Sequence, residues 1–81
     1  MIAEHAYAVL LHDIPEYGLV HGDVGVVVHI HRRPGESAPA GYMLELFTVD
    51  GESLDTVSVP ADAVRAATPA DRLHARPVAA E

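Results

Sequence analysis

Two histidines that lie two residues apart, His29 and His31, are the first candidates for chemistry in this 81-residue chain. On one strand their side chains would share a face, with Cα atoms roughly 6 to 7 Å apart. Such a pair can bind Zn²⁺ or Ni²⁺ when a third ligand comes near, and His12 or His21 could supply it. The alternative is a pair of exposed strand histidines. Because a lone His-x-His pair is a weak signal, we expect no metal site.

Three acidic residues, Asp13, Glu16 and Asp23, bracket a loop that contains proline and glycine. Paired carboxylates can act as general acid and general base when burial separates their pKa values. Nothing in the sequence predicts burial of these side chains, and no nucleophile or oxyanion donor accompanies them. We therefore expect a solvated acidic loop in which Asp13 or Asp23 accepts backbone N–H bonds in a turn. Neither catalysis nor a cofactor is expected.

Aromatic and large apolar side chains supply a third candidate, a contact surface. Tyr17 and Tyr42 could line an aromatic groove beside the first long loop, as in barrels that bind peptides, although Tyr42 also suits the core. Val27, Met43 and Phe47 are expected to point away from the core and to form an apolar patch, which is typical of contact surfaces. The predicted partner-binding residues are therefore Tyr17, Val27, Met43 and Phe47. A bulge that swaps the two faces, or a tail that covers them, would remove this patch.

The strands that must position these residues follow from the two-residue alternation of apolar side chains. A first strand is expected at residues 5–11, and the strongest strand pattern runs over residues 24–31. The alternation turns toward the core Tyr7, Val9 and Leu11 in the first strand, and Val24, Val26, Val28 and Ile30 in the second. Gly25 indicates a bend or the close approach of another backbone. Between the strands, the proline and glycines of residues 12–22 exclude regular structure, and apolar side chains are expected to pin this loop: Ile14, Tyr17 and Leu19.

The second half of the chain predicts three more strands. Residues 42–49 form the third, with Tyr42, Leu44 and Leu46 inward. Asp50-Gly51 is typical of a two-residue type I′ hairpin turn, and a fourth strand follows over residues 52–59 with Val57 and Val59 inward. Residues 61–64 predict one helical turn with Val64 buried, and residues 65–67 a short fifth strand.

These elements predict an all-β domain over residues 1–67 and a flexible, disordered C-terminal tail over residues 68–81, where large apolar residues are few. The expected architecture is a small five-stranded antiparallel barrel with a short helical turn near its end, because closure removes the exposed edges of a small sheet. An open sheet with a partner on its edge is the structural alternative.

The composition is acidic, with a net charge of -7 from five arginines, no lysine and twelve acidic residues. Binding to phosphates requires clustered lysine and arginine, and Arg32-Arg33 is the only basic pair, so the charge argues against nucleic acid. It is compatible with a protein partner that has a basic face. The absence of cysteine fits a reducing cytoplasm, and no apolar run approaches the roughly 20 residues that span a bilayer. We expect a cytoplasmic protein.

The segment Asp13-Ile-Pro-Glu-Tyr-Gly-Leu19, followed by Gly22-Asp-Val-Gly25 and a valine-rich strand, resembles a family of small bacterial proteins described as domain of unknown function 4926. The likeness covers residues 4–66 and continues at Tyr42, Glu45, Asp50-Gly51, Val57, Val59 and the segment 61–65. The resemblance implies an SH3-like barrel and no particular activity. The segment 22–27 also resembles the glycine-centred motif of KOW domains and the barrel portion of the nitrile hydratase β subunit.

We therefore expect a non-catalytic protein-interaction module. It would act as an accessory or neutralising subunit that docks on a partner protein, which could be encoded beside it, or on a second copy of itself. Two alternatives stay open. One is a KOW-like nucleic-acid or ribosome-associated module in which Arg32 and Arg33 contact phosphates. The other is a metal-binding protein that uses His29 and His31.

Overall fold

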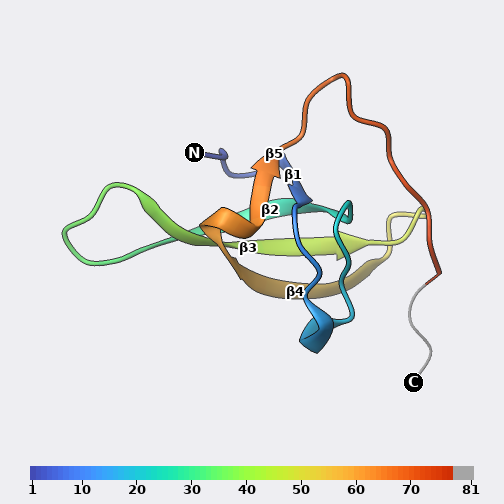
Figure 1. Cartoon of the computed structure of the whole chain (residues 1–81), viewed down its shortest axis with the longest axis horizontal. Helices are drawn as coiled ribbons and strands as arrows, with labels where there is room; N and C mark the ends of the chain where they lie inside the picture. The colour runs from blue at the N-terminus through green and yellow to red at the C-terminus, as the bar shows by residue number, and fades with distance from the viewer. Residues whose placement is uncertain (78–81) are drawn as a thin grey trace.

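Five antiparallel strands form one sheet in the computed structural model of the protein, which describes residues 1–77 (Figure 1). In chain order the elements are β1 (Tyr7–Leu10), the 3₁₀ helix η1 (Pro15–Tyr17), β2 (Val24–Arg32), β3 (Pro39–Phe47), β4 (Ser53–Pro60), the 3₁₀ helix η2 (Ala61–Ala63) and β5 (Val64–Ala66). The order across the sheet is β4-β3-β2-β1-β5. The expected all-β class, the five antiparallel strands and the short helical turn before the last strand are confirmed.

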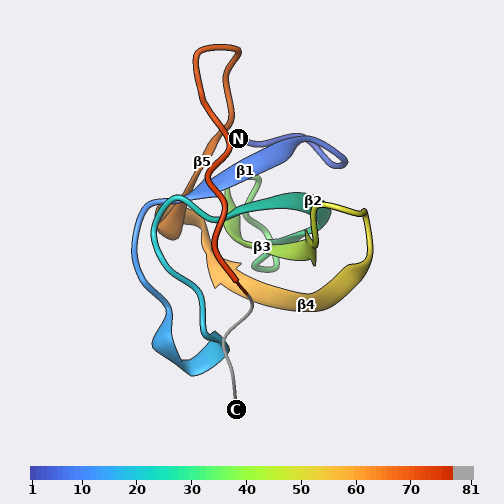
Figure 2. The same ribbon diagram turned by 90° about the vertical axis from the view of Figure 1, so that its right-hand side faces the viewer.

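The sheet curls around its core, as the end-on view shows (Figure 2). Within residues 1–77 no strand pairing joins β4 to β5, so the sheet is open between these two edge strands. The two longest strands, β2 and β3, lie at its centre. The η2 turn crosses from one edge of the sheet to the other and places Ala63 and Val64 against the core.

The core uses the inward faces that alternation predicted for the second half of the chain. Tyr42, Leu44 and Leu46 of β3 are buried, as are the inward valines of β4 and Val64 of β5. The hydroxyl of Tyr42 also accepts a buried hydrogen bond of 3.0 Å from the backbone N–H of Ile2. Tyr42 is therefore a core residue that ties the N-terminus to β3, and it does not line a surface groove.

The faces expected for β1 and for the start of β2 are wrong. Tyr7 is 61% exposed and Leu11 is exposed too, whereas Ala8 and Leu10 are buried in the core, and in β2 it is Gly25 and Val27 that point inward. Val9 is buried as expected, but it lies outside the core cluster. The two strands are inverted together because they pair directly, with Tyr7 opposite Val26. Alternation alone could not choose the face, since both strands carry apolar residues on each side.

A β-bulge at Val28 restores the expected face in the second half of β2. The register pairs Val27 with Leu44 but His29 with Met43, so Val28 is an extra residue in the ladder. Beyond it Ile30 packs against the core, while His29 stays exposed. The structure therefore contains the alternative that the sequence left open: the inward and outward faces of β2 change over at a bulge.

Gly25 lies where another backbone approaches, as expected. A Cβ atom at this position would lie 3.1 Å from the Cβ of Leu44 and 3.1 Å from a Cδ of Leu46. It would also lie 3.2 Å from the carbonyl oxygen of Glu45. The absence of a side chain thus allows β3 to pack closely across β2.

The β3–β4 hairpin turn lies at the predicted place but is not of type I′. That type needs positive φ at both central residues, whereas Gly51 has φ of +84° and Asp50 does not have a positive φ. The N–H of Gly51 bonds to the carbonyl of Thr48, and the N–H of Thr48 bonds to the carbonyl of Glu52. This pattern is that of a three-residue loop closed by a glycine bulge.

The described part of the expected flexible tail, residues 68–77, contains no helix or strand. It leaves β5, turns back and runs along the end of the sheet between the loop of residues 11–23 and the β3–β4 hairpin (Figure 2). The expectation for residues 78–81 lies outside the described residues. In the part of the chain that the structure covers, no helix has the length and apolar character needed to cross a membrane.

Candidate interaction groove

The four predicted partner-binding residues do not form one patch. Tyr17 and Phe47 are exposed and Met43 is half-buried, but Val27 is fully buried in the core. Val27 is therefore removed from the contact surface, because the faces of β1 and early β2 are the reverse of those expected. Tyr17 and Phe47 instead line an open groove to which neither Met43 nor Val27 contributes.

This groove collects most of the exposed large hydrophobic side chains of residues 1–77. Six of the eight line it, and the two outside are Met1 and Leu11. The six are Tyr7, Tyr17, Phe47, Val49, Leu54 and Leu73. Such side chains are normal when scattered singly, whereas their concentration in one place marks a contact surface.

Three walls and a floor shape the groove. The floor is the outer face of β1 and β2, where Tyr7 stands opposite Val26 and where Val24 also lies. One wall is the loop that carries Glu16 and Tyr17, a second is the β3–β4 hairpin, and the third is the tail at residues 73–77. These three segments are far apart in the sequence, and the curl of the sheet brings them to the same end of the molecule (Figure 2).

The loop wall is fixed by its own contacts. Leu19 is buried, and Ile14 packs partly against the core and pairs with Leu19 in an isolated bridge, so both residues hold the loop as expected. Tyr17 is exposed and does not hold the loop. Asp13 accepts a 2.9 Å bond from the backbone N–H of His21 and lies 3.1 Å from its Nδ1. The backbone bond, and then the side-chain bond, lower the pKa of the Asp13 carboxyl below its ordinary value.

Asp23, directly before β2, makes the largest number of hydrogen bonds among the described side chains of the groove. Its Oδ2 accepts the N–H of Val20 at 3.0 Å and an Nη of Arg76 at 2.6 Å. Its Oδ1 accepts the Nε–H of Arg76 at 2.9 Å and lies 2.9 Å from Nε2 of His74. Burial raises the pKa of Asp23, but the bonds from Arg76, Val20 and His74 outweigh it, and the net pKa lies below the ordinary value.

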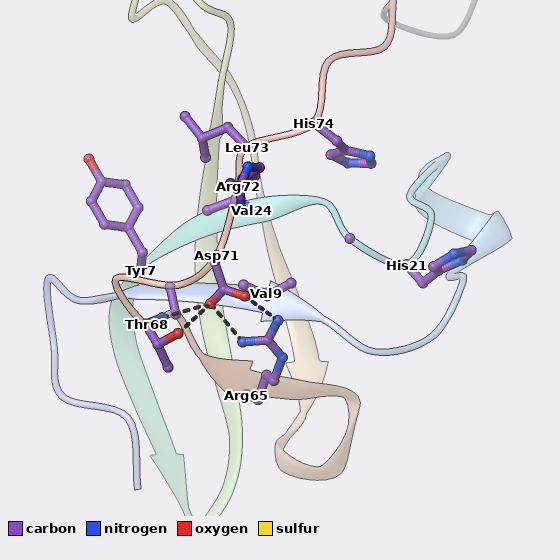
Figure 3. A pocket seen from close by; sticks show the side chains of 12 residues that line it. Tyr7, Val9, His21, Val24, Arg65, Thr68, Asp71, Arg72, Leu73 and His74 are labelled. Carbon is purple, nitrogen blue, oxygen red and sulfur yellow. Dashed lines mark hydrogen bonds and ion pairs between the residues drawn. The ribbon is translucent and has the colours of Figure 1, made fainter.

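A second ion pair anchors the start of the tail. Both oxygens of Asp71 accept bonds from the Arg65 guanidinium, at 2.7 and 2.8 Å, and one also accepts the N–H of Thr68 at 2.7 Å (Figure 3). The Arg65 bonds first, and then the Thr68 bond, hold the pKa of Asp71 far below its ordinary value. Between this anchor and the outer face of β1 lies a smaller pocket of about 520 Å³, lined by residues such as Tyr7 and Val9.

The histidine pair of β2 lies elsewhere on the sheet. The rings of His29 and His31 share a face, as expected, and meet edge to face with centroids 5.0 Å apart. Nε2 of His31 lies 3.1 Å from the hydroxyl of Ser58. Among residues 1–77 no three histidine, cysteine or acidic side chains are grouped closely enough to hold a metal ion, so neither His12 nor His21 completes a site.

The basic pair lies at the end of β2 and the start of the β2–β3 loop, at the opposite end of the molecule from the hairpin (Figure 1). The Nε–H of Arg32 donates to the carbonyl of Ser37 at 3.0 Å, and an Nη contacts the sulfur of Met1. The guanidinium of Arg32 therefore stabilises the β2–β3 loop, while Arg33 is exposed. The two do not face the groove.

Comparison with known proteins places the chain in a family. The model of the domain of unknown function DUF4926 matches residues 4–66. The chain belongs to this family. The match confirms the resemblance in the loop and second strand, and it includes Asp23 and both sides of the β3–β4 hairpin, but it ends before the tail of this DUF4926 protein. No curated protein and no solved structure matches the chain significantly.

Reasoning from the sequence missed Val49, Leu54 and the tail as parts of the groove. Val49, which is 99% exposed, was expected to belong to the third strand, but β3 ends at Phe47 and Val49 stands in the turn. An aliphatic residue in a hairpin turn was the available signal, since such turns favour small and polar residues. Nothing in the tail sequence indicated which acidic residue Arg76 would bond to.

Proposed function

We propose that this DUF4926 protein is a non-catalytic interaction module that docks on a partner protein through the groove. The observation that carries the proposal is the gathering of six of the eight exposed large hydrophobic side chains along one surface. Apolar surface that is contiguous gains free energy when a partner removes it from water. We propose that the protein serves its partner as an accessory or neutralising subunit.

The size of the groove supports a polypeptide as the occupant. Its volume is about 1430 Å³, and it is not enclosed. Pockets for small molecules are usually roughly 300–1,000 Å³ and enclose most of the ligand. A segment of a protein chain, with side chains that reach Phe47 and Leu54 on one side and Tyr17 on the other, suits the groove better.

The charge of the groove supports a basic partner. Among residues 1–77 the carboxylates in its lining are Glu16, Asp23 and Asp55, and the only basic side chains are His74 and Arg76 of the tail. The whole chain carries a net charge of -7. A positively charged partner surface would be attracted to it and would associate faster at low ionic strength.

We propose further that the curled sheet is an SH3-like barrel that works in the cytoplasm of a bacterium. The strand order β4-β3-β2-β1-β5 and the 3₁₀ turn that joins β4 to β5 support the barrel. The family resemblance supports both the barrel and the bacterial source. The cysteine-free sequence supports a reducing compartment.

The test is capture of a partner from a lysate of the native host, with one substitution in the groove and one outside it. Phe47 is 42% exposed in the groove, and Leu11 is 43% exposed outside it, so Phe47→Asp and Leu11→Asp make a matched pair. We expect the wild-type chain and Leu11→Asp to retain the same protein and Phe47→Asp to lose it at least tenfold. Circular dichroism checks that both variants fold. Equal retention by Phe47→Asp would contradict the use of the groove.

A further inference from the structure

The carboxylate of Asp23 is arranged as a receptor for a guanidinium group. Both of its oxygens bond to Arg76, and a second bond of the same guanidinium reaches the carbonyl oxygen of Gly18 at 2.8 Å. Planar, two-pronged contacts of this kind favour arginine over lysine. The Asp23 side chain is only 11% exposed, and the N–H of Val20 holds it in place.

The arginine that fills this receptor comes from a segment that is loosely attached. No backbone–backbone hydrogen bond joins residues 72–77 to the rest of the described chain. Leu73 is 84% exposed although it borders the groove. His74, whose ring lies against Gly22, and Arg76 both end on Asp23. Contacts through side chains alone can be exchanged for equivalent contacts from another chain.

Asp23 belongs to the part of the chain that matches the family, whereas Arg76 does not. Asp23 and Gly18 lie within the residues that match DUF4926, whereas Arg76 lies beyond them. Without the tail, the described lining of the groove contains Glu16, Asp23 and Asp55 and no basic side chain. Asp23 would then be a carboxylate without its arginine partner, still held by the N–H of Val20 at the edge of an apolar groove, where it attracts a cation.

We infer that the groove recognises an extended segment of its partner by an arginine, and that this arginine replaces Arg76 on Asp23. The inference rests on the proposed function and adds the chemistry of the partner. The tail of the free protein is a tethered stand-in for that segment. It supplies an arginine to Asp23 but leaves Phe47 and Leu54 exposed, so a partner segment with apolar residues beside its arginine gains contacts that the tail lacks.

The experiment uses the full chain, labelled with ¹⁵N, and two synthetic peptides. One peptide has the sequence of residues 70–77, Ala-Asp-Arg-Leu-His-Ala-Arg-Pro, and the other carries the change Arg76→Gln. The receiving chains are the wild type, Arg76→Gln, and the control Arg72→Gln. The control makes the same charge change, and Arg72 forms no hydrogen bond or ion pair with the described residues. The amide signals of Gly18, Val20 and Gly22 report on the site.

In the Arg76→Gln chain we expect saturable shifts of these amide signals with the arginine peptide and at least fivefold weaker binding of the glutamine peptide. The wild type and the Arg72→Gln chain should bind the arginine peptide at least tenfold more weakly, because a tethered tail competes at an effective concentration near millimolar. Equal binding of the two peptides, no binding of either, or equal affinity of the wild type and Arg76→Gln chains would overturn the inference.

The two proposals fail in different ways. If the peptides do not distinguish arginine from glutamine while Phe47→Asp still abolishes capture of the partner, the groove is an interaction site but Asp23 is not its arginine receptor. If the arginine preference holds while Phe47→Asp retains the partner, Asp23 binds arginine but the apolar groove is not the docking surface.

Discussion

The inward position of Val27 predicts an unequal response to truncation of two neighbouring valines. Val27 is fully buried between β1 and β3, whereas Val26 is part of the groove floor and is only half-buried. Val27→Ala and Val26→Ala remove the same atoms from the same strand, with the same change in strand propensity. The difference between the two free energies of unfolding therefore measures which face is the core.

The magnitude follows from the atoms removed. Two buried methyl groups correspond to about 1.6 kcal/mol of lost transfer free energy at about 0.8 kcal/mol each. The cavity left behind adds to this, so Val27→Ala should cost about 2–3 kcal/mol. Val26→Ala should cost less than about 1 kcal/mol, because water already reaches part of the side chain. A chain of 81 residues has a total stability of roughly 4–12 kcal/mol, so the larger loss is readily measured.

The assay is urea unfolding followed by circular dichroism, with thermal unfolding as a second measurement. In a domain of this size each kcal/mol shifts the midpoint temperature by roughly 4–8 °C. We expect Val27→Ala to unfold about 8–24 °C below the wild type and Val26→Ala less than about 8 °C below it. Equal losses, or a larger loss for Val26→Ala, would refute the inverted faces of β1 and β2.

Three further predictions follow from single contacts. Tyr42→Phe leaves the buried N–H of Ile2 without its acceptor and should cost about 1–3 kcal/mol in urea unfolding, whereas Tyr17→Phe at an exposed tyrosine should cost almost nothing. The pKa of Asp23 in the folded state lies below its ordinary value of 3.8, so its hold on the tail is complete above that value and is lost as the pH falls through the lower folded pKa. The ¹⁵N signals of His74, Ala75 and Arg76 should move to their free positions in that range, and Asp23→Asn should show these free positions at all pH values, while the Arg65–Asp71 pair still holds the start of the tail. Calorimetry with Zn²⁺ should give equally weak heats for the wild type and His31→Ala, since the described residues hold no third ligand for the pair; a larger heat for the wild type would contradict this.

The sequence predicted the strands better than it predicted their faces. In β4 the apolar residues alternate with polar ones, and in β3 Glu45 indicates the outward face, so Leu44, Leu46 and Val57 could be assigned to the core. In β2 the residues from Val24 to Val28 are all apolar or glycine, and the pattern gives no preference for either side. The decisive information was the pairing of β1 with β2 and the bulge at Val28, which depend on contacts between segments far apart in the chain.

The tail was the least predictable part of the site for the same reason. Residues 68–77 have few large apolar side chains, and their composition is that of an unstructured segment. Two arginine–aspartate pairs, Arg65 with Asp71 and Arg76 with Asp23, nevertheless hold it against the sheet. The second pair joins residues 53 positions apart. Such a pairing follows from the fold and cannot be derived from local sequence.

The valine-rich start of β2 connects the fold to the groove. A strand that is apolar on both faces is typical of a sheet that is covered on both sides. The core covers Gly25 and Val27 on one side, but on the other side Val24 and Val26 line the groove and remain half-buried among the described residues. If solvation were the only demand on that outer face, polar residues would serve it as they do in β4, where Thr56 and Ser58 point outward. The apolar outer face of β2 therefore supports the proposal that a partner completes its burial.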